Sequence, residues 1–229
     1  MRVALCLHGL VGTNEKYGTG NKKISAKLAY RHFKERVFDI NADVDVFFHT
    51  WDVVHEEKLQ DLYNPVDYKV EEQPKYSENV REQAIYCRWK STKEVINLLN
   101  NSENEYDFVL LTRFDIAFLV DFDFSTFESD VFYAQGPAGP RKGSINLIND
   151  LWFVANQDNI IKFASLYDHL EDPRYQKYLD SNHELARKHI EETGLSSILQ
   201  YRFNREWNGA SGKLNSDTPL IRWHYLKKV

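Results

Sequence analysis

The sequence predicts an α/β protein with a central mixed, mainly parallel sheet flanked by helices. Short apolar runs recur along the chain, and amphipathic helical stripes separate them. The runs at residues 3–7 and 108–112 are continuous rather than alternating, which is typical of strands that helices cover on both faces. We therefore expect parallel strands early in the chain and antiparallel strands later.

Each element follows from its local pattern, in chain order. We expect strands at residues 3–7, 108–115, 131–134 and 151–154, and a strand with the loop at its carboxyl end at residues 43–52. We expect helices at the stripe of Ile24, Leu28 and Phe33, and at residues 84–100, 159–170 and 184–192, the last closed by Gly194. Residues 53–83 are polar, contain Pro65 and Pro74 and are expected to be irregular. Residues 136–140 are expected to form a turn-rich loop.

The composition is that of an ordinary globular protein and disfavours several classes. The 229 residues are 42% hydrophobic and 28% charged, and the net charge of −5 argues against a broad nucleic-acid surface. No apolar run approaches the ~20 residues needed to cross a bilayer, so we expect no membrane span. Cys6 and Cys87 make no disulfide framework, which favours a reducing, cytoplasmic compartment.

Arg113 and Asp115 are the strongest candidate site residues. They follow the buried run at residues 108–112, and open α/β sheets bind ligands at the carboxyl ends of their strands. A carboxylate at that point can hold a hard divalent ion, and the ion and the guanidinium can share the charge of a diphosphate. The structural alternatives are a turn cap for Asp115 and a salt bridge for Arg113.

Several common active-site motifs are absent from the sequence. Leu7-His8-Gly9 is similar to the oxyanion segment of an esterase, but no G-x-S-x-G supplies a nucleophile, which disfavours a hydrolase. There is no G-x-x-x-x-G-K-[ST], and Gly18-Thr-Gly20 lacks the third glycine of a dinucleotide site. Without C-x-x-C or H-E-x-x-H, zinc has no obvious site.

Five segments in a fixed order resemble a known family. They are ALCLHG, DVFFHTWD, RWKSTKEVI, FVLLTRFDI and NDLWFVAN, within residues 2–156. The order resembles the GT-A-fold glycosyltransferases that chlorella viruses encode for capsid glycosylation. The resemblance implies a GT-A-like, Rossmann-like fold, a UDP-hexose or UDP-deoxyhexose donor, Mn²⁺ or Mg²⁺, and a glycan or glycoprotein acceptor. For a viral enzyme the compartment would be the host cytoplasm.

The resemblance also implies a division of the chain and a set of site residues. One domain would span residues 1–229, with the nucleotide-binding part at about 1–120 and the acceptor part at about 121–229. Contacts to the nucleotide are expected from His8, Gly9, Leu10, Val11, Thr13, Thr50, Trp51, Arg88, Ser91 and Arg113. Asp115, with a late histidine, His224, would hold the metal. Asp150 and Arg113 would be catalytic, Asp150 as the group that activates the acceptor or contacts the sugar.

Several alternatives remain open for these residues. Such enzymes normally carry Asp-x-Asp, and here Arg113 takes the place of the first carboxylate. Asp121 and Asp123 form a second possible metal site, whereas Asp43-Val-Asp45 lies at the start of a strand, the wrong end for ligands. Packed core is the alternative for Trp51 and His224, and a solvated helix face for Arg88. The basic pair at residues 141–142 is a lid over the diphosphate or an exposed turn.

The function itself has two rivals to a glycosyltransferase. One is a non-catalytic nucleotide-sugar or carbohydrate-binding module of a longer protein. The other is a metal-dependent nucleotidyltransferase, which would use a nucleoside triphosphate and release pyrophosphate. The sequence leaves open the donor sugar, the acceptor, the anomeric outcome and the oligomeric state.

Overall fold

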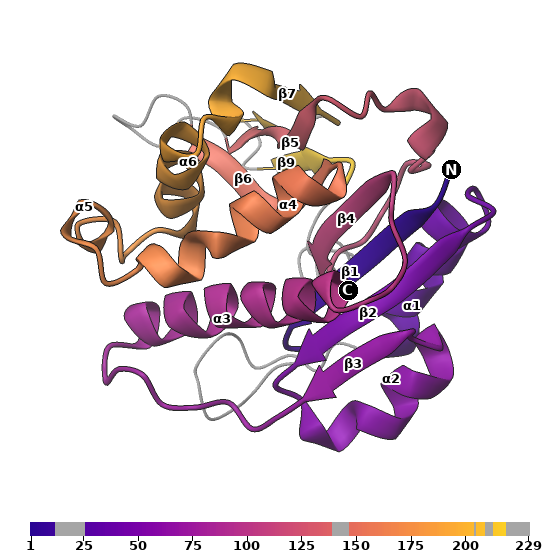
Figure 1. Ribbon diagram of the computed structural model, residues 1–229, viewed down its shortest axis with the longest axis horizontal. Helices are drawn as coiled ribbons and strands as arrows, with labels where there is room; N and C mark the ends of the chain where they lie inside the picture. Colours follow the sequence, from indigo (N-terminus) through magenta and orange to yellow (C-terminus); the bar gives the residue numbers. More distant parts are fainter. Residues whose placement is uncertain (12–25, 139–146, 204, 209–212, 219–229) are drawn as a thin grey trace.

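The computed structural model of the chain has a seven-stranded sheet between two layers of helices (Figure 1). It describes residues 1–11, 26–138, 147–203, 205–208 and 213–218. The strand order is β3-β2-β1-β4-β6-β5-β7. The strands are β1 (Val3–Gly9), β2 (Val44–Thr50), β3 (Asp67–Val70), β4 (Phe108–Arg113), β5 (Phe132–Ala138), β6 (Leu147–Ala155) and β7 (Leu199–Arg202).

The sheet has a parallel part formed by strands early in the chain and antiparallel pairs formed later, as the sequence predicts. Strands β3, β2, β1 and β4 are mutually parallel, and β6 pairs with β4 and with β5 in the antiparallel sense. Strand β7 is parallel to β5. The expected α/β class and the mixed, mainly parallel sheet are confirmed, because β6 alone among these seven strands runs against the others.

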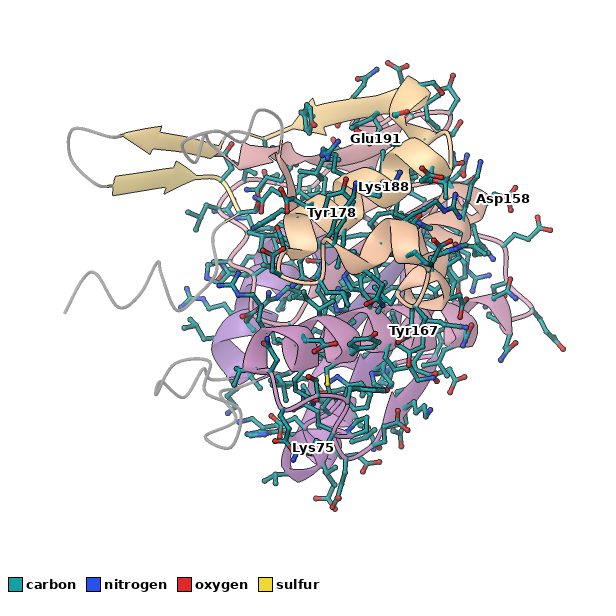
Figure 2. All side chains as sticks on the ribbon, turned by 90° about the vertical axis from the view of Figure 1, so that its left-hand side faces the viewer. Lys75, Asp158, Tyr167, Tyr178, Lys188 and Glu191 are labelled. Carbon is teal, nitrogen blue, oxygen red and sulfur yellow. The ribbon has the colours of Figure 1, made fainter. Side chains whose placement is uncertain are left out.

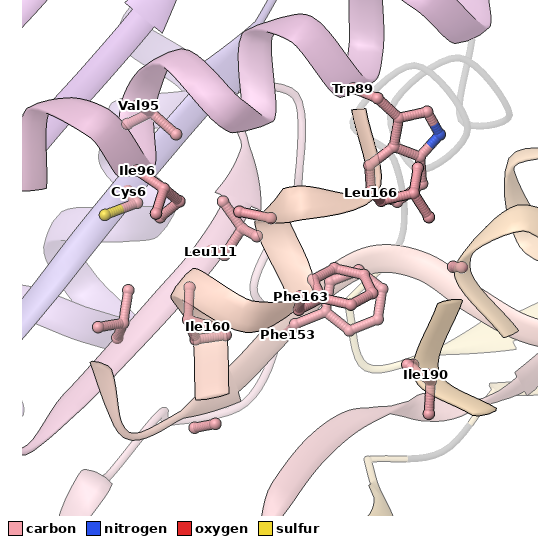
Figure 3. Packing of buried hydrophobic residues seen from close by; sticks show 14 of the residues in the cluster. Cys6, Trp89, Val95, Ile96, Leu111, Phe153, Ile160, Phe163, Leu166 and Ile190 are labelled. Atoms are coloured by element: carbon pink, nitrogen blue, oxygen red, sulfur yellow. The ribbon is translucent and has the colours of Figure 1, made fainter. Parts of the chain in front are cut away.

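One face of the sheet is covered by α3 (Val80–Asn100), α4 (Gln157–Ala164) and α6 (Asn182–Glu192), with the short α5 (Pro173–Gln176) beside them. Side chains alternate across a strand, and Ala4 and Cys6 of β1 pack here with Trp89 of α3. Phe153 and Phe163 meet with ring centroids 4.3 Å apart (Figure 3). On the outside of α6, Lys188 and Glu191 lie away from this core (Figure 2).

The other face is covered by α1 (Ala26–Phe33), its π-helical continuation Lys34–Phe38, and α2 (Glu56–Tyr63). Its core is rich in phenylalanine, since the segment after β4 contributes Phe114, Phe118, Phe122 and Phe124, all fully buried. This segment therefore closes the core below β4 and β6 and is not a free loop.

Several predicted boundaries are wrong. Residues 53–83 are not irregular: they contain a 3-10 turn at Val53–His55, helix α2 and edge strand β3. The strand expected at 151–154 begins at Leu147, and β5 continues into the expected loop at 136–140 as far as Ala138. The helix expected at 84–100 begins at Val80, where the Asn79 side chain caps it by accepting from the Arg81 and Glu82 amides. The helix expected at 159–170 is α4 followed by the 3-10 helix Ser165–His169.

Two further features complete the described chain. Strands β8 (Arg205–Asn208) and β9 (Lys213–Ser216) form an antiparallel ribbon that extends from the main body (Figure 2). Cys6 and Cys87 are both buried, free thiols. In the described part of the chain, no helix combines the length and apolar character that a bilayer span requires.

Candidate functional site

The candidate site lies at one rim of the sheet, where four strands meet. The carboxyl ends of the parallel strands β1, β2 and β4 share this rim, and the register pairs His8 with Arg113 and Gly9 with Thr50. Because β6 is antiparallel to β4, its amino end, which carries Asp150, reaches the same rim. Arg113 and Asp115 therefore lie where the sequence places them, at the end of β4.

Side-chain alternation decides which residues face helix α3. Residues 4 and 6 of β1 and 109 and 111 of β4 pack on the α3 side, so His8 and Arg113, two positions further along, lie on that side too. Phe47 marks the same side of β2 and places His49 there. Helix α3 covers these residues with Arg88 and Ser91, which are three apart and share a helix face.

Arg113 and Asp115 form a two-point ion pair. The Arg113 Nε and Nη2 atoms each donate to one Asp115 carboxylate oxygen at 2.8 Å. The Asp115 side chain is 6% exposed and that of Arg113 27% exposed. Burial alone would lower the pKa of Arg113, but the charge of Asp115 and its hydrogen bonds raise it, so the guanidinium is charged at all physiological pH values.

Arg88 and Asp150 form a second, more buried pair, with both side chains 8% exposed. The Arg88 Nη2 atom donates to the backbone carbonyl of Asp150, and Nε lies 3.5 Å from Oδ2. Burial lowers the pKa of Arg88 to about 10, against the charge of Asp150, so the guanidinium stays charged at neutral pH. The Arg88 Nε–H is buried and has no hydrogen-bond partner among the described residues.

Asp150 lies inside β6, because that strand begins at Leu147 and not at the expected residue 151. Burial alone would raise the pKa of its carboxyl group, but Arg88, His183 and Arg113 together lower that pKa below its usual value. Asp150 is therefore ionised at neutral pH, and two arginines and a histidine surround it.

His183 is a further candidate site residue, one that the sequence does not predict. It is the second residue of α6, and its Nδ1 atom lies 3.1 Å from Asp150 Oδ1 and 2.9 Å from the carbonyl oxygen of Ile148. Its side chain is 29% exposed. Asp150 and His183 are 33 positions apart in the chain, so no local sequence motif predicts that they pair.

His8 is almost completely buried at the centre of this rim, and its exposed fraction is 2%. Burial, together with the charges of Arg88, Arg113 and His49, lowers the pKa of His8 well below its ordinary value. The ring is therefore neutral at pH 7, and its Nδ1 atom has no hydrogen-bond partner among the described residues. Buried polar atoms without partners are uncommon in folded proteins, so this atom is a candidate contact for a ligand.

The expected nucleotide contacts Gly9 and Ser91 touch each other. Gly9 has a φ of +94°, a conformation that favours glycine, and its N–H donates to Ser91 Oγ at 2.8 Å. The same hydroxyl lies 2.7 Å from His49 Nδ1, and His49 Nε2 lies 3.1 Å from a carboxylate oxygen of Glu71. Ser91 and His49 are fully buried, so this network supports the backbone at the end of β1.

The other predicted nucleotide contacts have different surroundings. Trp51 is 6% exposed, donates from its indole nitrogen to the Cys87 carbonyl and packs edge-on against His49, which is the core role left open above. Thr50 is fully buried, and its hydroxyl accepts from the Asp52 amide. Val11 is buried, whereas Leu10 is partly exposed. Residues Thr13, Arg141, Lys142 and His224 lie outside the described residues.

The second aspartate motif has structural partners. Asp121 pairs with Arg36 at 2.7 Å, and Asp123 caps a 3-10 turn by accepting from the Ser125 amide at 2.9 Å. Asp45 likewise accepts from Arg2 and from the hydroxyl of Tyr106. Each of these carboxylates therefore has a defined structural role.

Whether the protein alone can bind a metal ion depends on the number of ligand side chains at the rim. Within the described ranges, no three His, Cys, Asp or Glu side chains are grouped so that they could hold an ion. Asp115 supplies one carboxylate, beside two guanidinium groups. This donor set suits an ion that arrives with a phosphate ligand, since Mg²⁺ is commonly held by one or two carboxylates together with substrate phosphates. It does not make a protein cage for a resident ion.

Comparison with known proteins finds no matching family model and no matching curated protein. Among solved structures, the chain is similar to the crystal structure of a glycosyltransferase involved in the glycosylation of the major capsid of PBCV-1. The sequence identity is 11% and the TM-score 0.48, and the match covers 88% of this chain and 81% of that chain.

Proposed function

We propose that this protein is a glycosyltransferase that moves a sugar from a nucleoside diphosphate donor to a glycan or glycoprotein acceptor. One observation carries the proposal: two buried or half-buried arginines, two carboxylates and a neutral histidine with an unpartnered nitrogen meet at the ligand-binding rim of an α/β sheet. Guanidinium groups bind phosphate oxygens at two points, which suits them to a diphosphate.

Arg113 and Arg88 are the groups that would hold the diphosphate. When the bond between the sugar and the diphosphate breaks, negative charge builds on the departing oxygen. A cation already fixed in position stabilises that charge without reorganisation, and the two-point pair with Asp115 fixes Arg113 in this way. Arg88 is held by Asp150, and its free Nε–H remains as a donor.

Asp115 is the residue that would hold a Mn²⁺ or Mg²⁺ ion at the diphosphate. A bound ion would act as a Lewis acid on the phosphate oxygens. Because the described residues make no metal cage, we expect the ion to bind together with the nucleotide. His224 remains a predicted further ligand, from the sequence resemblance alone.

The donor is most simply a UDP-sugar, the choice that the resemblance implies. The nucleoside would lie over the ends of β1 and β2, next to Gly9 and Leu10, and His8 Nδ1 offers it or the sugar a hydrogen bond. The acceptor would approach from the side of β6 and α6, where Asp150 and His183 lie.

The test is release of UDP from UDP-glucose, UDP-galactose and UDP-N-acetylglucosamine in the presence of Mn²⁺. Slow release, with water as the acceptor, supports a transferase. Tight binding of UDP without release from any of these donors favours the rival, a non-catalytic module. That rival is favoured by one observation, the arginine at the position of the usual first carboxylate. Release of pyrophosphate from UTP would instead indicate a nucleotidyltransferase.

A further inference from the structure

We infer that His183 is the base that takes the proton of the acceptor hydroxyl, and that Asp150 is the positioning residue that orients it. The inference rests on the proposed function and adds a residue to it. It also changes the role expected for Asp150, from a group that activates the acceptor or contacts the sugar to one that holds the imidazole in place.

The contacts of Nδ1 determine which nitrogen of His183 carries the hydrogen. Nδ1 lies 2.9 Å from the carbonyl oxygen of Ile148 and 3.1 Å from Asp150 Oδ1. A carbonyl oxygen and a carboxylate oxygen can only accept hydrogen bonds, so Nδ1 must be the donor. In the neutral ring, Nε2 then carries the lone pair, which is the state that a base requires.

Asp150 is less suited to be the base. Its side chain is only 8% exposed, it is paired with Arg88, and it faces His183 and Arg113 as well. These positive and polar neighbours stabilise the carboxylate and so weaken it as a proton acceptor. The His183 side chain is 29% exposed, and none of the described residues forms a hydrogen bond with its Nε2 atom.

The local fold holds His183 at the rim. Helix α6 begins after Ser181, whose hydroxyl accepts from the Glu184 amide at 3.3 Å, and this cap fixes the first turn. His183 then reaches two points on β6, the Ile148 carbonyl and the Asp150 carboxylate. Because the amino end of β6 shares the rim with Arg113, the imidazole lies on the same side of the sheet as the cations proposed to hold the diphosphate.

Sugar transfer takes place in a single displacement. The acceptor O–H gives its proton to His183 Nε2, and the oxygen forms a bond to the anomeric carbon of the donor sugar. The bond from that carbon to the diphosphate oxygen breaks, and its electron pair leaves with the nucleoside diphosphate. The imidazolium ion, stabilised by Asp150, then returns its proton to water. One displacement inverts the anomeric configuration, so the product is predicted to be inverted.

The first test measures the tautomer and needs no substrate. In the full chain with ¹⁵N-labelled histidine, long-range ¹H–¹⁵N spectra assign the His183 signals by their loss in His183→Gln. We expect neutral His183 to carry its hydrogen on Nδ1, and Asp150→Asn to shift the ring towards the Nε2–H form. A predominant Nε2–H form in the wild-type protein would overturn the inference.

The second test measures turnover of UDP-glucose, UDP-galactose and UDP-N-acetylglucosamine with Mn²⁺. Because a general base contributes about 10²–10⁴-fold to a rate, we expect His183→Gln to lower kcat at least about 100-fold. The KM of the donor should stay within about twofold, since the base does not contact the diphosphate. His169→Gln is the matched control: His169 lies on the 3-10 helix Ser165–His169, stacked on Tyr175, and its replacement should leave kcat unchanged.

The outcomes separate this inference from the proposed function. Full activity of His183→Gln, or a product of retained configuration, overturns the inference and leaves the glycosyltransferase standing. No UDP release by the wild-type chain, whatever its tautomer, overturns the proposed function and the base assignment with it. Asp150→Asn removes the charge partner of the buried Arg88, so the folding of this variant is checked by circular dichroism. If it is unfolded, His183→Gln alone decides between the outcomes.

Discussion

The hydroxyl of Ser91 accepts a hydrogen bond from the backbone N–H of Gly9 at 2.8 Å. The contact joins helix α3 to the carboxyl end of β1, across 82 residues of sequence, at the point where the chain turns with a φ of +94°. Through His49 and Glu71 the same network reaches β2 and the segment after β3. The rim of the proposed donor site is thus held by a buried polar network.

Ser91→Ala is expected to destabilise the fold by about 1–3 kcal/mol, because it leaves the Gly9 N–H and His49 Nδ1 without their partner in a buried environment. Urea unfolding followed by fluorescence measures the change. Ser197→Ala is the control, since Ser197 is exposed and bonds only the nearby Gly194 carbonyl. Equal stability of the two variants would show that the network does not support the rim.

Gly9→Ala tests the backbone at the same point. A Cβ atom at Gly9 would meet no atom within 4 Å, so crowding is not the problem. The positive φ is the reason for the expected loss, because holding an L-residue in that conformation costs about 1–2 kcal/mol. We expect that loss in urea unfolding, together with weaker UDP binding. A variant as stable as the wild type would mean that the turn relaxes freely.

Arg113→Lys is expected to weaken UDP binding by about 10–100-fold. Lysine cannot bind the diphosphate oxygens at two points as a guanidinium can, and a charge-assisted hydrogen bond is worth about 1.5–3 kcal/mol. Isothermal titration calorimetry measures the Kd. The matched control is Arg174→Lys, which alters a similar arginine–aspartate pair with Asp172 on the exposed side of helix α5. An unchanged Kd in Arg113→Lys would remove this guanidinium from the donor site.

Mild acid is expected to destabilise the protein through its buried histidines. Burial lowers the pKa of His189 to about 4, and the pKa values of His8, His32 and His49 also shift downward. The unfolded chain therefore binds more protons below pH ~6.5. The histidines therefore contribute their full share to the free energy of unfolding above that pH, and this contribution is lost as the pH falls to about 4. The loss is about 3 kcal/mol for His189 alone.

His189→Gln should flatten part of this pH dependence, because the variant has no proton to gain at that position. Urea unfolding at pH 7, 6 and 5 compares it with His55→Gln as the control, because His55 lies on the 3-10 turn Val53–His55 with its side chain 37% exposed. The wild-type protein would contradict the account if it became more stable between pH 6.5 and pH 4.5.

The sequence predicts the parts of this fold that local patterning decides. Continuous apolar runs identify β1 and β4, so the sequence places Arg113 and Asp115 correctly at the carboxyl end of β4, and their role in a site stays a prediction. Strand β3 is missed because it has four residues, none fully buried, and only its pairing with β2 makes it a strand. Thr50 ends β2 and Trp51 directly follows it, close to the predicted strand end, but tertiary packing buries both side chains.

The parts of the site that depend on long-range contacts are not visible in the sequence. Asp150 meets His183 only because α6 packs on β6, and Arg88 meets Asp150 across 62 residues. The spacing of residues along the sequence does not predict contacts between residues so far apart. The resemblance implied that Asp150 activates the acceptor or contacts the sugar, whereas we infer from the geometry that its neighbour His183 is the base.

The most direct test of the central claim, that the rim between Arg88, Arg113 and Asp115 binds a nucleoside diphosphate, is thermal unfolding with UDP and Mn²⁺. Saturating UDP with Mn²⁺ should stabilise the protein by about 2.7 kcal/mol at a hundredfold excess over Kd and raise Tm by about 5–10 °C. Mn²⁺ alone should not raise Tm, and Asp115→Asn should keep the gain from UDP while losing the extra gain from the metal. A wild-type Tm that UDP with Mn²⁺ leaves unchanged, or an equal metal-dependent gain in Asp115→Asn, would contradict the account.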